Sequence, residues 1–470
     1  MGTRRLMVPD AAGPAPTDPQ PLYRHLADSD GIDRFGEQIE TPDPSGWPGY
    51  AGQVAAARQA TGSRHAVTTG MAKVAGQRCV IVGFDFSFLG GSVGVAEGAR
   101  IAQAFSVALA QRVPVLTIAA TGGSRMQEGT SALMQMQVMA AAIAAARRAG
   151  IPHIAVAADP TTGGIWASLV SSADLLIGVP GARVSFSGSR TRPGGADPDA
   201  VQYLADGQWA RGFVDVLAPV AELRAIVAAA IRLLAPRSRD GVVRQAPVPD
   251  WPRGGRGQTG QTDAAPASAW AQVQAARSPG RPDADRWLDR YFDETVQIRG
   301  DRCGGLDNGV RCGFGTHRGA TIGYVAETGL RVTAAGFRTA SRLLSLAARL
   351  RVPVLTLIDT PGAAAAPEDE AVGVGPAIAD LLVAIATSQV PITSVIIGQG
   401  VSGGALALAS PTDLWIAEDA YLAVTAPELA AAILKLGAAD VPAVAGLLRL
   451  TPADLHSRGI VRGIIRPGPN

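Results

Sequence analysis

The stretch RVPVLTIAATGG, from Arg112 to Gly123, recurs later in the chain as RVPVLTLIDTPG, from Arg351 to Gly362. The two copies are identical at eight of twelve positions. Each begins with a short run rich in β-branched residues, which is typical of a buried strand, and each ends in a glycine turn. A match of this length indicates that the chain contains the same structural unit twice.

The repeat extends beyond this stretch. Downstream, Ile151-Pro152 and Val390-Pro391 each open an apolar run that ends in a glycine pair. The pairs are Gly163-Gly164 and Gly403-Gly404, and because the second lies one position further along, we expect one inserted residue there. Alternating strands, turns and helices predict an α/β unit in each half. The expected elements are a strand at Val113–Ala119 and helices at Ala99–Gln111, Leu133–Ala149, Thr339–Leu350, Pro376–Ser388 and Gly404–Ala409.

Length and composition predict a soluble protein of two domains. A chain of 470 residues exceeds the roughly 250 to 300 residues at which a single hydrophobic core stops growing. Apolar residues make up 47% of the chain and charged residues 17%, and no run of about 18 uncharged apolar residues occurs. The polar segment that follows Met1 lacks the apolar stretch of a secretory signal, so we expect a cytoplasmic protein with no membrane partner.

Charge and cysteine content argue against two further classes of protein. The formal net charge of +2 is spread along the chain without a basic patch, so nucleic-acid binding is not expected. The three cysteines, Cys79, Cys303 and Cys312, form no CxxC pair. We therefore expect neither a disulfide framework nor a bound zinc ion or other metal.

A segment rich in Pro, Gly, Arg and Gln separates the two halves. Such a composition, sustained over about 50 residues, is typical of a linker rather than of a compact domain. The expected boundaries are a flexible tail at 1–50, a first domain at 51–235, the linker at 236–285 and a second domain at 286–470.

Chemistry is expected where strands lead into helices through glycine turns. A helix N-terminus presents unpaired backbone N–H groups, and a glycine there lets a ligand oxygen approach the backbone. No GxSxG elbow, Walker or GxGxxG fingerprint occurs at such a junction, so catalysis would depend on N–H donors that stabilise an oxyanion. The candidate turns are Gly122-Gly123, Gly163-Gly164, Pro361-Gly362 and Gly403-Gly404.

Several motifs resemble those of a known enzyme family. FLGGSVGVAEG from Phe88, ATGGSRMQEG from Ala120 and DPTTGGIWAS from Asp159 are similar to the β subunit of the bacterial acetyl-CoA carboxylase carboxyltransferase. YFDETVQIRGDR from Tyr291 and IGQGVSGGALALAS from Ile397 resemble its α subunit. The motifs follow one another in the family's order, so the chain looks like a fusion of the β and α subunits.

The resemblance implies a fold of the α/β class with two tandem crotonase-like domains, each a twisted sheet superhelix flanked by helices. It also implies the reaction, in which the carboxyl group of carboxybiotin passes to acetyl-CoA and gives malonyl-CoA for fatty acid synthesis. Biotin would be carried on a biotin carboxyl carrier protein that a biotin carboxylase charges. The family's working site combines domains of different protomers, so a homodimer is expected.

The resemblance also assigns the site residues. Gly122 and Gly123 would donate N–H groups to the thioester enolate oxygen, and Gly403 and Gly404 would donate to the ureido oxygen of biotin. Substrate contacts are expected from Arg125, Gly163, Gly164 and Gly362, and the candidate ligands of the CoA phosphates are Arg125, Arg190 and Arg192.

The sequence departs from the family pattern in four places, one of which is Ala364–Pro367, where the family's aromatic and glycine character after IDTPGA is missing. Residues 1–77 lack the four cysteines of the usual zinc ribbon, Ile322–Gly336 lacks the family's basic segment, and Trp166 replaces a small residue. Two alternatives therefore stay open. One is a malonyl-thioester decarboxylase or a carboxyltransferase for another acyl-CoA, independent of biotin or differently coupled, and the other is a non-catalytic assembly subunit.

Overall fold

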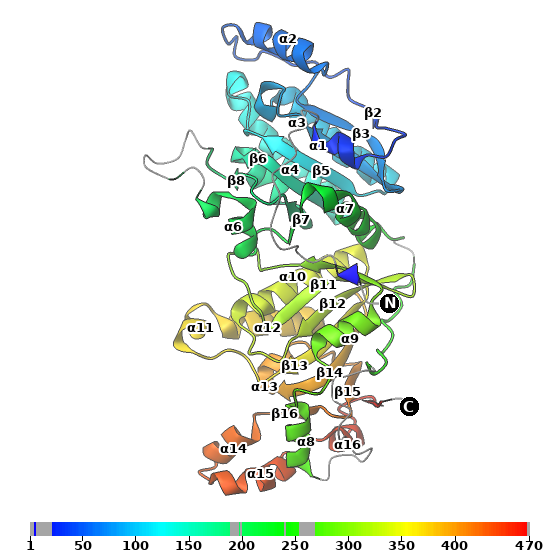
Figure 1. Ribbon diagram of the computed structural model, residues 1–470, viewed down its shortest axis with the longest axis vertical. Coiled ribbons are helices and arrows are strands. Elements are labelled where there is room, and N and C mark those ends of the chain that lie inside the picture. The colour runs from blue at the N-terminus through cyan, green and yellow to red at the C-terminus, as the bar shows by residue number, and fades with distance from the viewer. Residues whose placement is uncertain are drawn as a thin grey trace. The chain divides into compact units, whose positions relative to one another are not determined.

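Two compact units make up the chain, and each is described by itself. The computed structural model describes residues 4–5, 21–188, 197, 200–238, 241–252 and 268–467. The N-terminal unit comprises Leu6–Arg239, and the C-terminal unit comprises Asp240–Asn470 together with Met1–Arg5. Each unit contains one sheet with helices packed against it (Figure 1).

The N-terminal unit has an eight-stranded sheet in the order β2-β3-β4-β5-β6-β7-β9, with β8 paired to β6. The β3–β4 hairpin is antiparallel, and the strands from β4 to β9 are parallel. The strands are β2 (Asp33–Arg34), β3 (Val67–Val74), β4 (Gln77–Phe84), β5 (Val115–Thr121), β6 (His153–Thr162), β7 (Leu175–Gly178), β8 (Val184–Ser185) and β9 (Val216–Leu217). The helices are α1 (Leu22–Leu26), α2 (Tyr50–Thr61), η1 (Leu89–Gly91), α3 (Val95–Gln111), η2 (Met126–Glu128), α4 (Gly129–Arg148), α5 (Gly163–Ile165), η3 (Trp166–Val170), η5 (Val201–Tyr203), α6 (Ala205–Ala210) and α7 (Val220–Leu234).

The C-terminal unit has a nine-stranded sheet in the order β1-β10-β11-β12-β13-β14-β15-β17, with β16 paired to β14. Its strands are β1 (Arg4–Arg5), β10 (Glu294–Ile298), β11 (Val310–His317), β12 (Ala320–Glu327), β13 (Val354–Thr360), β14 (Ile392–Val401), β15 (Leu414–Ala417), β16 (Tyr421–Ala423) and β17 (Ile464–Ile465). Its helices are α8 (Ala269–Ala276), α9 (Ala284–Tyr291), α10 (Ala334–Leu350), α11 (Pro367–Ala371), α12 (Val374–Ala386), α13 (Ser402–Leu406), α14 (Pro427–Ile433), η6 (Ala438–Asp440), α15 (Val441–Leu447) and α16 (Pro452–Ser457).

The two units repeat one order of elements. β4, α3, β5, α4 and β6 correspond to β12, α10, β13, α12 and β14. Arg112 and Arg351, the residues that end α3 and α10, both have left-handed backbones with φ of +51° and +56°. The structure therefore confirms the pair of α/β units predicted from the RVPVLT repeat.

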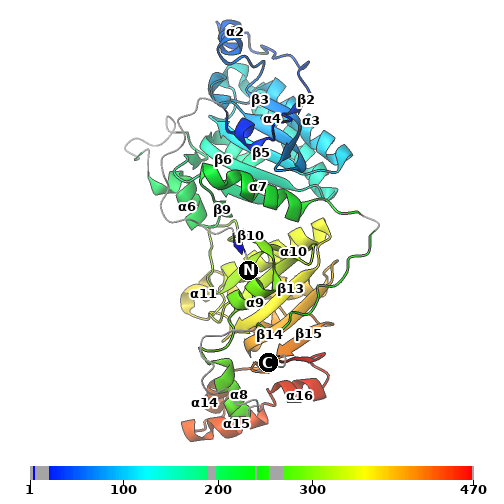
Figure 2. The same cartoon turned by 45° about the vertical axis from the view of Figure 1, so that its right-hand side comes forward.

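Helices cover the central strands of each sheet. In the N-terminal unit α3 packs against α4 and contacts β3 and β4, and α7 contacts β3, β4 and β6 and lies along the sheet in Figure 2. In the C-terminal unit α10 packs against α12 and contacts β11 and β12. Since successive residues of a strand point to opposite faces, the unbroken burial of β13 shows that both of its faces are covered.

The start of α3 depends on a distant side chain. The helix begins at Val95 rather than at the predicted Ala99. Glu97 accepts a hydrogen bond from the amide of Gly94 (3.1 Å), and Glu128 accepts one from the amide of Val95 (2.6 Å). Glu128 belongs to η2, which follows β5, so the residues next to the start of α3 do not indicate this cap.

Residues 21–50, which the sequence places in a flexible tail, fold onto the first sheet. Tyr23 is fully buried, and a β-carbon on Gly83 of β4 would lie 2.2 Å from its ring. The amide of Phe35 donates to the carbonyl of Thr69 (3.1 Å). The first domain therefore begins before residue 51, because this segment covers one end of the sheet.

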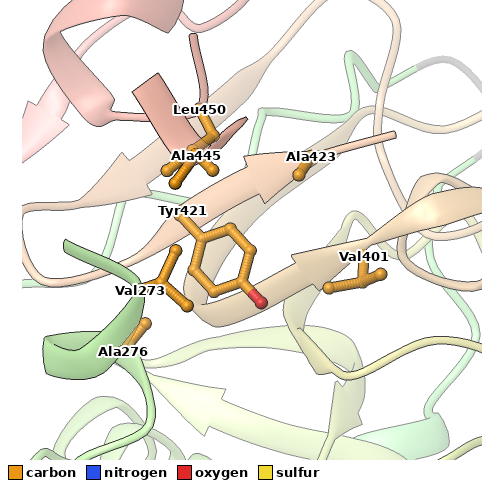
Figure 3. Packing of buried hydrophobic residues seen from close by; sticks show 7 residues of the cluster. All are labelled: Val273, Ala276, Val401, Tyr421, Ala423, Ala445 and Leu450. Atoms are coloured by element: carbon orange, nitrogen blue, oxygen red, sulfur yellow. The ribbon is translucent and has the colours of Figure 1, made fainter. Parts of the chain in front are cut away.

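Part of the predicted linker, 236–285, belongs to the core of the C-terminal unit. Val273 and Ala276 of α8 are fully buried and join a cluster that includes Tyr421, Ala445 and Leu450 (Figure 3). The single apolar stripe of α8 is too short to stand out in a segment rich in Pro and Gly. Residues 253–267 lie outside the described part of the chain.

One helical run of the described residues, Met126–Arg148, is long and apolar enough to cross a membrane by length and composition alone. A core helix of a soluble protein passes the same test, so this run is weak evidence for a membrane span.

Asp419, in the turn between β15 and β16, is a buried carboxylate that affects stability. Neither of its oxygens has a hydrogen-bond partner among the described residues. Burial raises the pKa of Asp419 to about 7, partly offset by the positive charge of Arg281. Since the ordinary pKa is about 4, the folded state favours the protonated acid, and ionisation costs stability increasingly from about pH 4 to about pH 7.

We expect Asp419→Asn to raise Tm at pH 8, because the amide removes the cost of a buried charge. The gain should shrink as the pH falls below about 7 and vanish near pH 4, where the acid is neutral in both states. Thermal unfolding across this range measures the gain, with Asp380→Asn, at an exposed position on α12, as the control. A gain of Tm that does not change with pH would contradict this account.

Candidate active site

Two glycine turns lie against each other at the ends of the parallel strands β5 and β6. Gly123 (φ +109°) and Gly163 (φ +70°) both have backbone conformations that favour glycine. A β-carbon on Gly123 would lie 3.4 Å from the Cα of Gly163 and 3.7 Å from the amide nitrogen of Gly164. The turns predicted from two separate motifs therefore meet in one place.

The amides of Gly122 and Gly123 are already engaged. Gly122 N–H donates to the carbonyl of Gly90 (2.9 Å), and Gly123 N–H donates to Thr121 Oγ1 (3.0 Å). The sequence predicts these two glycines as oxyanion donors, and in the structure both amides instead donate to groups that hold the shape of the turn. Their contribution is the backbone freedom and the open space that the turn requires.

The amides of Ser124 and Gly164 have no hydrogen-bond acceptor within the described chain. Ser124 pairs with Val93 in an isolated parallel β-bridge. The two hydrogen bonds of this bridge run from the amide of Val93 to the carbonyl of Gly123 (2.9 Å) and from the amide of Arg125 to the carbonyl of Val93 (2.8 Å). Since neighbouring residues of an extended chain direct their amides to opposite sides, the amide of Ser124 points away from Val93. Gly164 lies in the first turn of α5, where an amide has no helical acceptor.

The C-terminal unit repeats this geometry. Gly362 (φ +119°) donates its amide to Thr360 Oγ1 (3.1 Å), and Val332 is bridged to Ala363. Among the residues that the structure describes, the amide of Ala363 has no acceptor. A β-carbon on Gly404 would lie 2.6 Å from the nitrogen of Ala363, so only glycine fits beside that amide.

The glycine pairs correspond without an inserted residue, contrary to the expectation from sequence. β6 and β14 each have ten residues, and the helix that follows opens at Gly163 (φ +70°) in one unit and at Ser402 (φ +61°) in the other. Gly164 therefore corresponds to Gly403, whose amide also lacks an acceptor within the described chain. Ser402 has a left-handed backbone that is rare for residues with a side chain, and such strain clusters at functional sites.

Arg125, predicted to bind substrate, is 0% exposed. Its guanidinium forms ion pairs with Glu97 (2.8 Å) and Glu128 (3.3 Å). A fully buried guanidinium does not reach a phosphate group in solvent, so the structure gives Arg125 an internal role instead. Arg190 and Arg192 lie outside the described residues.

A buried carboxylate before the second turn was not predicted. Asp359 is ion-paired with Arg281, accepts a hydrogen bond from the amide of Gln399 (2.9 Å), and accepts one at its carbonyl from Gly329 (2.7 Å). These bonds join the ends of β12, β13 and β14. Asp359 could have been noticed in the sequence, because it is a charged residue inside the apolar run VLTLIDT. Its partner Arg281 lies in the predicted linker, where no pattern marks it.

Arg331 places a positive charge beside the second turn. Its Nη1 donates to the carbonyl of Ala363 (3.2 Å) and would lie 3.8 Å from a β-carbon on Gly362. The side chain is exposed. Arg331 belongs to the stretch that lacks the family's basic segment, and sequence reasoning passed over it because a lone arginine on a loop has no pattern.

Each unit can therefore stabilise one oxyanion with two backbone amides. The donors are Ser124 and Gly164 in the N-terminal unit, and Ala363 and Gly403 in the C-terminal unit. Aimed amides of this kind favour charge that develops on an oxygen during a reaction. In the described part of the chain, no group of three or more His, Cys, Asp or Glu side chains is arranged to hold a metal ion.

Family models match both halves of the chain. The carboxyl transferase domain matches residues 41–191, and the acetyl co-enzyme A carboxylase carboxyltransferase-like family matches residues 261–469.

Curated relatives match most of the chain. It is 37% identical over 483 residues to the acetyl-coenzyme A carboxylase carboxyl transferase subunits beta/alpha of Salinispora tropica, covering 98% of this chain and 85% of that protein. It is 34% identical over 431 residues to the probable biotin-dependent acyl-coenzyme A carboxylase beta3 subunit of Mycobacterium tuberculosis, covering 90% and 84%.

Solved structures share the fold. The transcarboxylase 12S crystal structure, a hexamer with methylmalonyl-coenzyme A bound, has a TM-score of 0.77 at 19% identity and covers 95% of this chain and 86% of that one. A single-chain, multi-domain long-chain acyl-CoA carboxylase has a TM-score of 0.74 at 19% identity, covering 95% and 44%.

The two tandem crotonase-like domains, the family models and the relatives place the chain in the class of biotin-dependent carboxyltransferases. The chain belongs to the family of acetyl-CoA carboxylase carboxyl transferases with fused β and α subunits. This membership confirms the resemblance seen in the motifs.

We expect Gly123→Ala to lower carboxyl transfer by about a hundredfold, the order of effect of losing one oxyanion donor. The added methyl group is strained at φ +109° and shifts the turn that aims the Ser124 amide. Gly181→Ala is the control, because Gly181 also has a positive φ (+74°) and has open space around an added β-carbon. Equal activity of the two variants at equal Tm would refute the role of the turn.

Proposed function

We propose that this chain transfers the carboxyl group of carboxybiotin to acetyl-CoA, giving malonyl-CoA, as the carboxyltransferase component of an acetyl-CoA carboxylase. The observation that carries the proposal is the repeated pair of unpartnered amides, one pair in each unit. A transfer between two carriers needs two oxyanion sites, one for the thioester oxygen and one for the ureido oxygen. The names and coverage of the fused relatives support this assignment.

The N-terminal unit binds the acyl thioester in this proposal. When the proton on the α-carbon leaves, negative charge develops on the thioester oxygen, and the amides of Ser124 and Gly164 donate to it. Gly123 and Gly163 carry no side chain, so the oxygen can approach both amides closely. Ser124 directly follows the predicted donor Gly123, and Gly164 was predicted as a substrate contact.

The C-terminal unit fits a biotin ureido group. Ala363 and Gly403 hold their amides without an acceptor in the described chain, and a β-carbon on Gly403 would meet no atom within 4 Å. Carboxybiotin, when bound, supplies the carboxyl group that is transferred. The two amides would donate to its ureido oxygen, and Arg331 would place a positive charge beside the carboxylate.

Self-association and a carrier partner complete the proposal. The α14–α15 pair exposes apolar side chains, among them Ile433 at 72% and Leu447 at 78%. Exposed apolar surface of this kind marks interaction sites. We propose that a second copy of the chain covers it in a homodimer or larger assembly, that a biotin carboxyl carrier protein and a biotin carboxylase act with it, and that the protein is cytoplasmic.

We expect the purified chain to convert malonyl-CoA to acetyl-CoA only when biotin or a biotinylated carrier is supplied, because the carboxyl group needs an acceptor. Acetyl-CoA formation measured by chromatography, with and without free biotin, tests this. Turnover that is indifferent to biotin would point to a biotin-independent decarboxylase. Absence of turnover with every carrier and acyl-CoA would point to an assembly subunit.

We expect Leu447→Glu to reduce the mass of the assembly in native mass spectrometry, because a charge replaces a buried apolar contact. Val242→Glu is the control, because Val242 is 91% exposed and lies outside α14 and α15. If both variants keep the parent's mass, α14–α15 is not the contact surface.

A further inference from the structure

A buried network of charged and polar groups lies behind the first oxyanion turn. Arg125, Glu97 and Glu128 are 0% exposed, and Tyr50 is 1% exposed. Arg125 pairs with Glu97 (2.8 Å) and Glu128 (3.3 Å), and the Tyr50 hydroxyl donates to Glu128 Oε1 (2.5 Å). Arg125 Nη1 also donates to the Tyr50 hydroxyl oxygen (3.2 Å). The four side chains therefore form one closed cluster.

Backbone amides complete the cluster, so its charges are not left bare. Glu128 accepts from the amide of Val95 (2.6 Å), and Glu97 accepts from the amides of Gly94 (3.1 Å) and Ala66 (3.3 Å). The first amides of α3 carry partial positive charge, which favours the two carboxylates beside a single guanidinium. A buried charge network that is satisfied in this way fixes one geometry, and loss of a single partner is costly.

The network is joined directly to the catalytic backbone. Arg125 follows Ser124, and its amide donates to the carbonyl of Val93 (2.8 Å). Its side chain donates to the carbonyl of Ser92 (2.7 Å) and to Ser92 Oγ (3.2 Å). Arg125 therefore holds Ser92 and Val93, the segment that pairs with the turn, through both its backbone and its side chain. The direction of the Ser124 amide depends on these bonds.

Tyr50 connects the Arg125 network to residues 1–50, which the sequence places in a tail. It begins α2 and packs with Val54 and Phe88 in a small apolar cluster. Burial and the neighbouring Glu128 raise the pKa of the Tyr50 hydroxyl, so it stays protonated and donates. Helix α2 is thus coupled through one hydroxyl to the turn of the acyl site.

The C-terminal unit shows that the turn itself does not need this network. At the corresponding positions, Ala364 replaces Arg125, Gly336 replaces Glu97 and Pro367 replaces Glu128. The turn at Gly362 nevertheless has the same threonine bond and positive φ. In the C-terminal unit the amide of Thr333, which corresponds to Gly94, donates to Asp307 (2.6 Å), so a carboxylate cap is kept there and only the part of the network built on Arg125 is specific to the N-terminal unit.

We propose that Tyr50 is a positioning residue of the acyl-thioester site, which holds the Ser124 amide in its donating direction through Glu128 and Arg125. The proposal rests on the proposed function for its catalytic meaning. In this proposal a residue of the predicted tail, Tyr50, affects the acyl-thioester site and does not affect the biotin site.

Tyr50→Phe tests the proposal against Tyr23→Phe. Tyr23 is also fully buried in the N-terminal segment, and its hydroxyl bonds Thr68 Oγ1 (3.0 Å) away from the turn. Loss of a hydrogen bond to a charged group is expected to lower kcat for carboxyl transfer from malonyl-CoA to free biotin about tenfold in Tyr50→Phe. KM for free biotin should not change, and Tyr23→Phe should keep kcat within about twofold of the parent at a similar loss of Tm.

Amide hydrogen exchange in the free protein gives a readout that does not depend on turnover. Exchange at residues 123–129 should rise about tenfold in Tyr50→Phe and should not rise in Tyr23→Phe. Ser92→Ala, which removes the Arg125–Ser92 Oγ bond at a partly buried position, should shift exchange and kcat in the same direction and serves if Tyr50→Phe folds poorly.

Equal exchange and kcat in Tyr50→Phe and Tyr23→Phe would overturn the proposal, and so would a tenfold rise of KM for free biotin in Tyr50→Phe. If the parent chain shows no turnover, the proposed function fails. The exchange comparison still decides whether Tyr50 holds the turn.

Discussion

The structure depends on one constraint at the ends of its parallel strands. The turn that follows a strand must leave backbone amides open to a ligand, although the turn of the neighbouring strand lies in contact with it. Gly123 meets Gly163 in one unit, where its φ of +109° disfavours a side chain, and Gly404 meets Ala363 in the other, where a β-carbon would lie 2.6 Å from the nitrogen of Ala363. Thr121 and Thr360 hold the two turns through the same hydroxyl-to-amide bond. Parallel strands buried on both faces supply the rigid ends from which these turns project.

The two units share this scaffold and differ in what supports it. In the N-terminal unit the support is a buried guanidinium held by two carboxylates and a tyrosine. In the C-terminal unit Asp359 and Arg281 tie the strand ends together before the turn, and Arg331 lies on the exposed side. Arg331 is exposed beside the second turn, whereas Arg125 is fully enclosed behind the first, so only the second turn offers an arginine to a ligand in solvent.

Much of the fold could be predicted, because the signals for it are local. Strand periodicity, helix-forming stretches and the repeated RVPVLT are readable in short windows, and the structure places strands and helices there within a few residues. The glycine turns were also located correctly. Which amides are free was not predictable, because Gly122 is engaged by the carbonyl of Gly90, and only the folded chain brings these two residues together. The burial of Arg125 was not predictable for the same reason, since its partners lie in other elements.

The sequence by itself determined the class of fold, the internal duplication, the family and the positions of the glycine turns, since each is recorded in contiguous residues. Tertiary structure decided which amides lack an acceptor, the burial of Arg125, and the membership of α1, α2 and α8 in the two cores. These depend on contacts between residues far apart in the chain, such as Tyr50 with Glu128. They also depend on the alternating directions of backbone amides along an extended chain. A backbone amide has no letter of its own in a sequence, so an active site built from amides becomes visible only when the chain is folded.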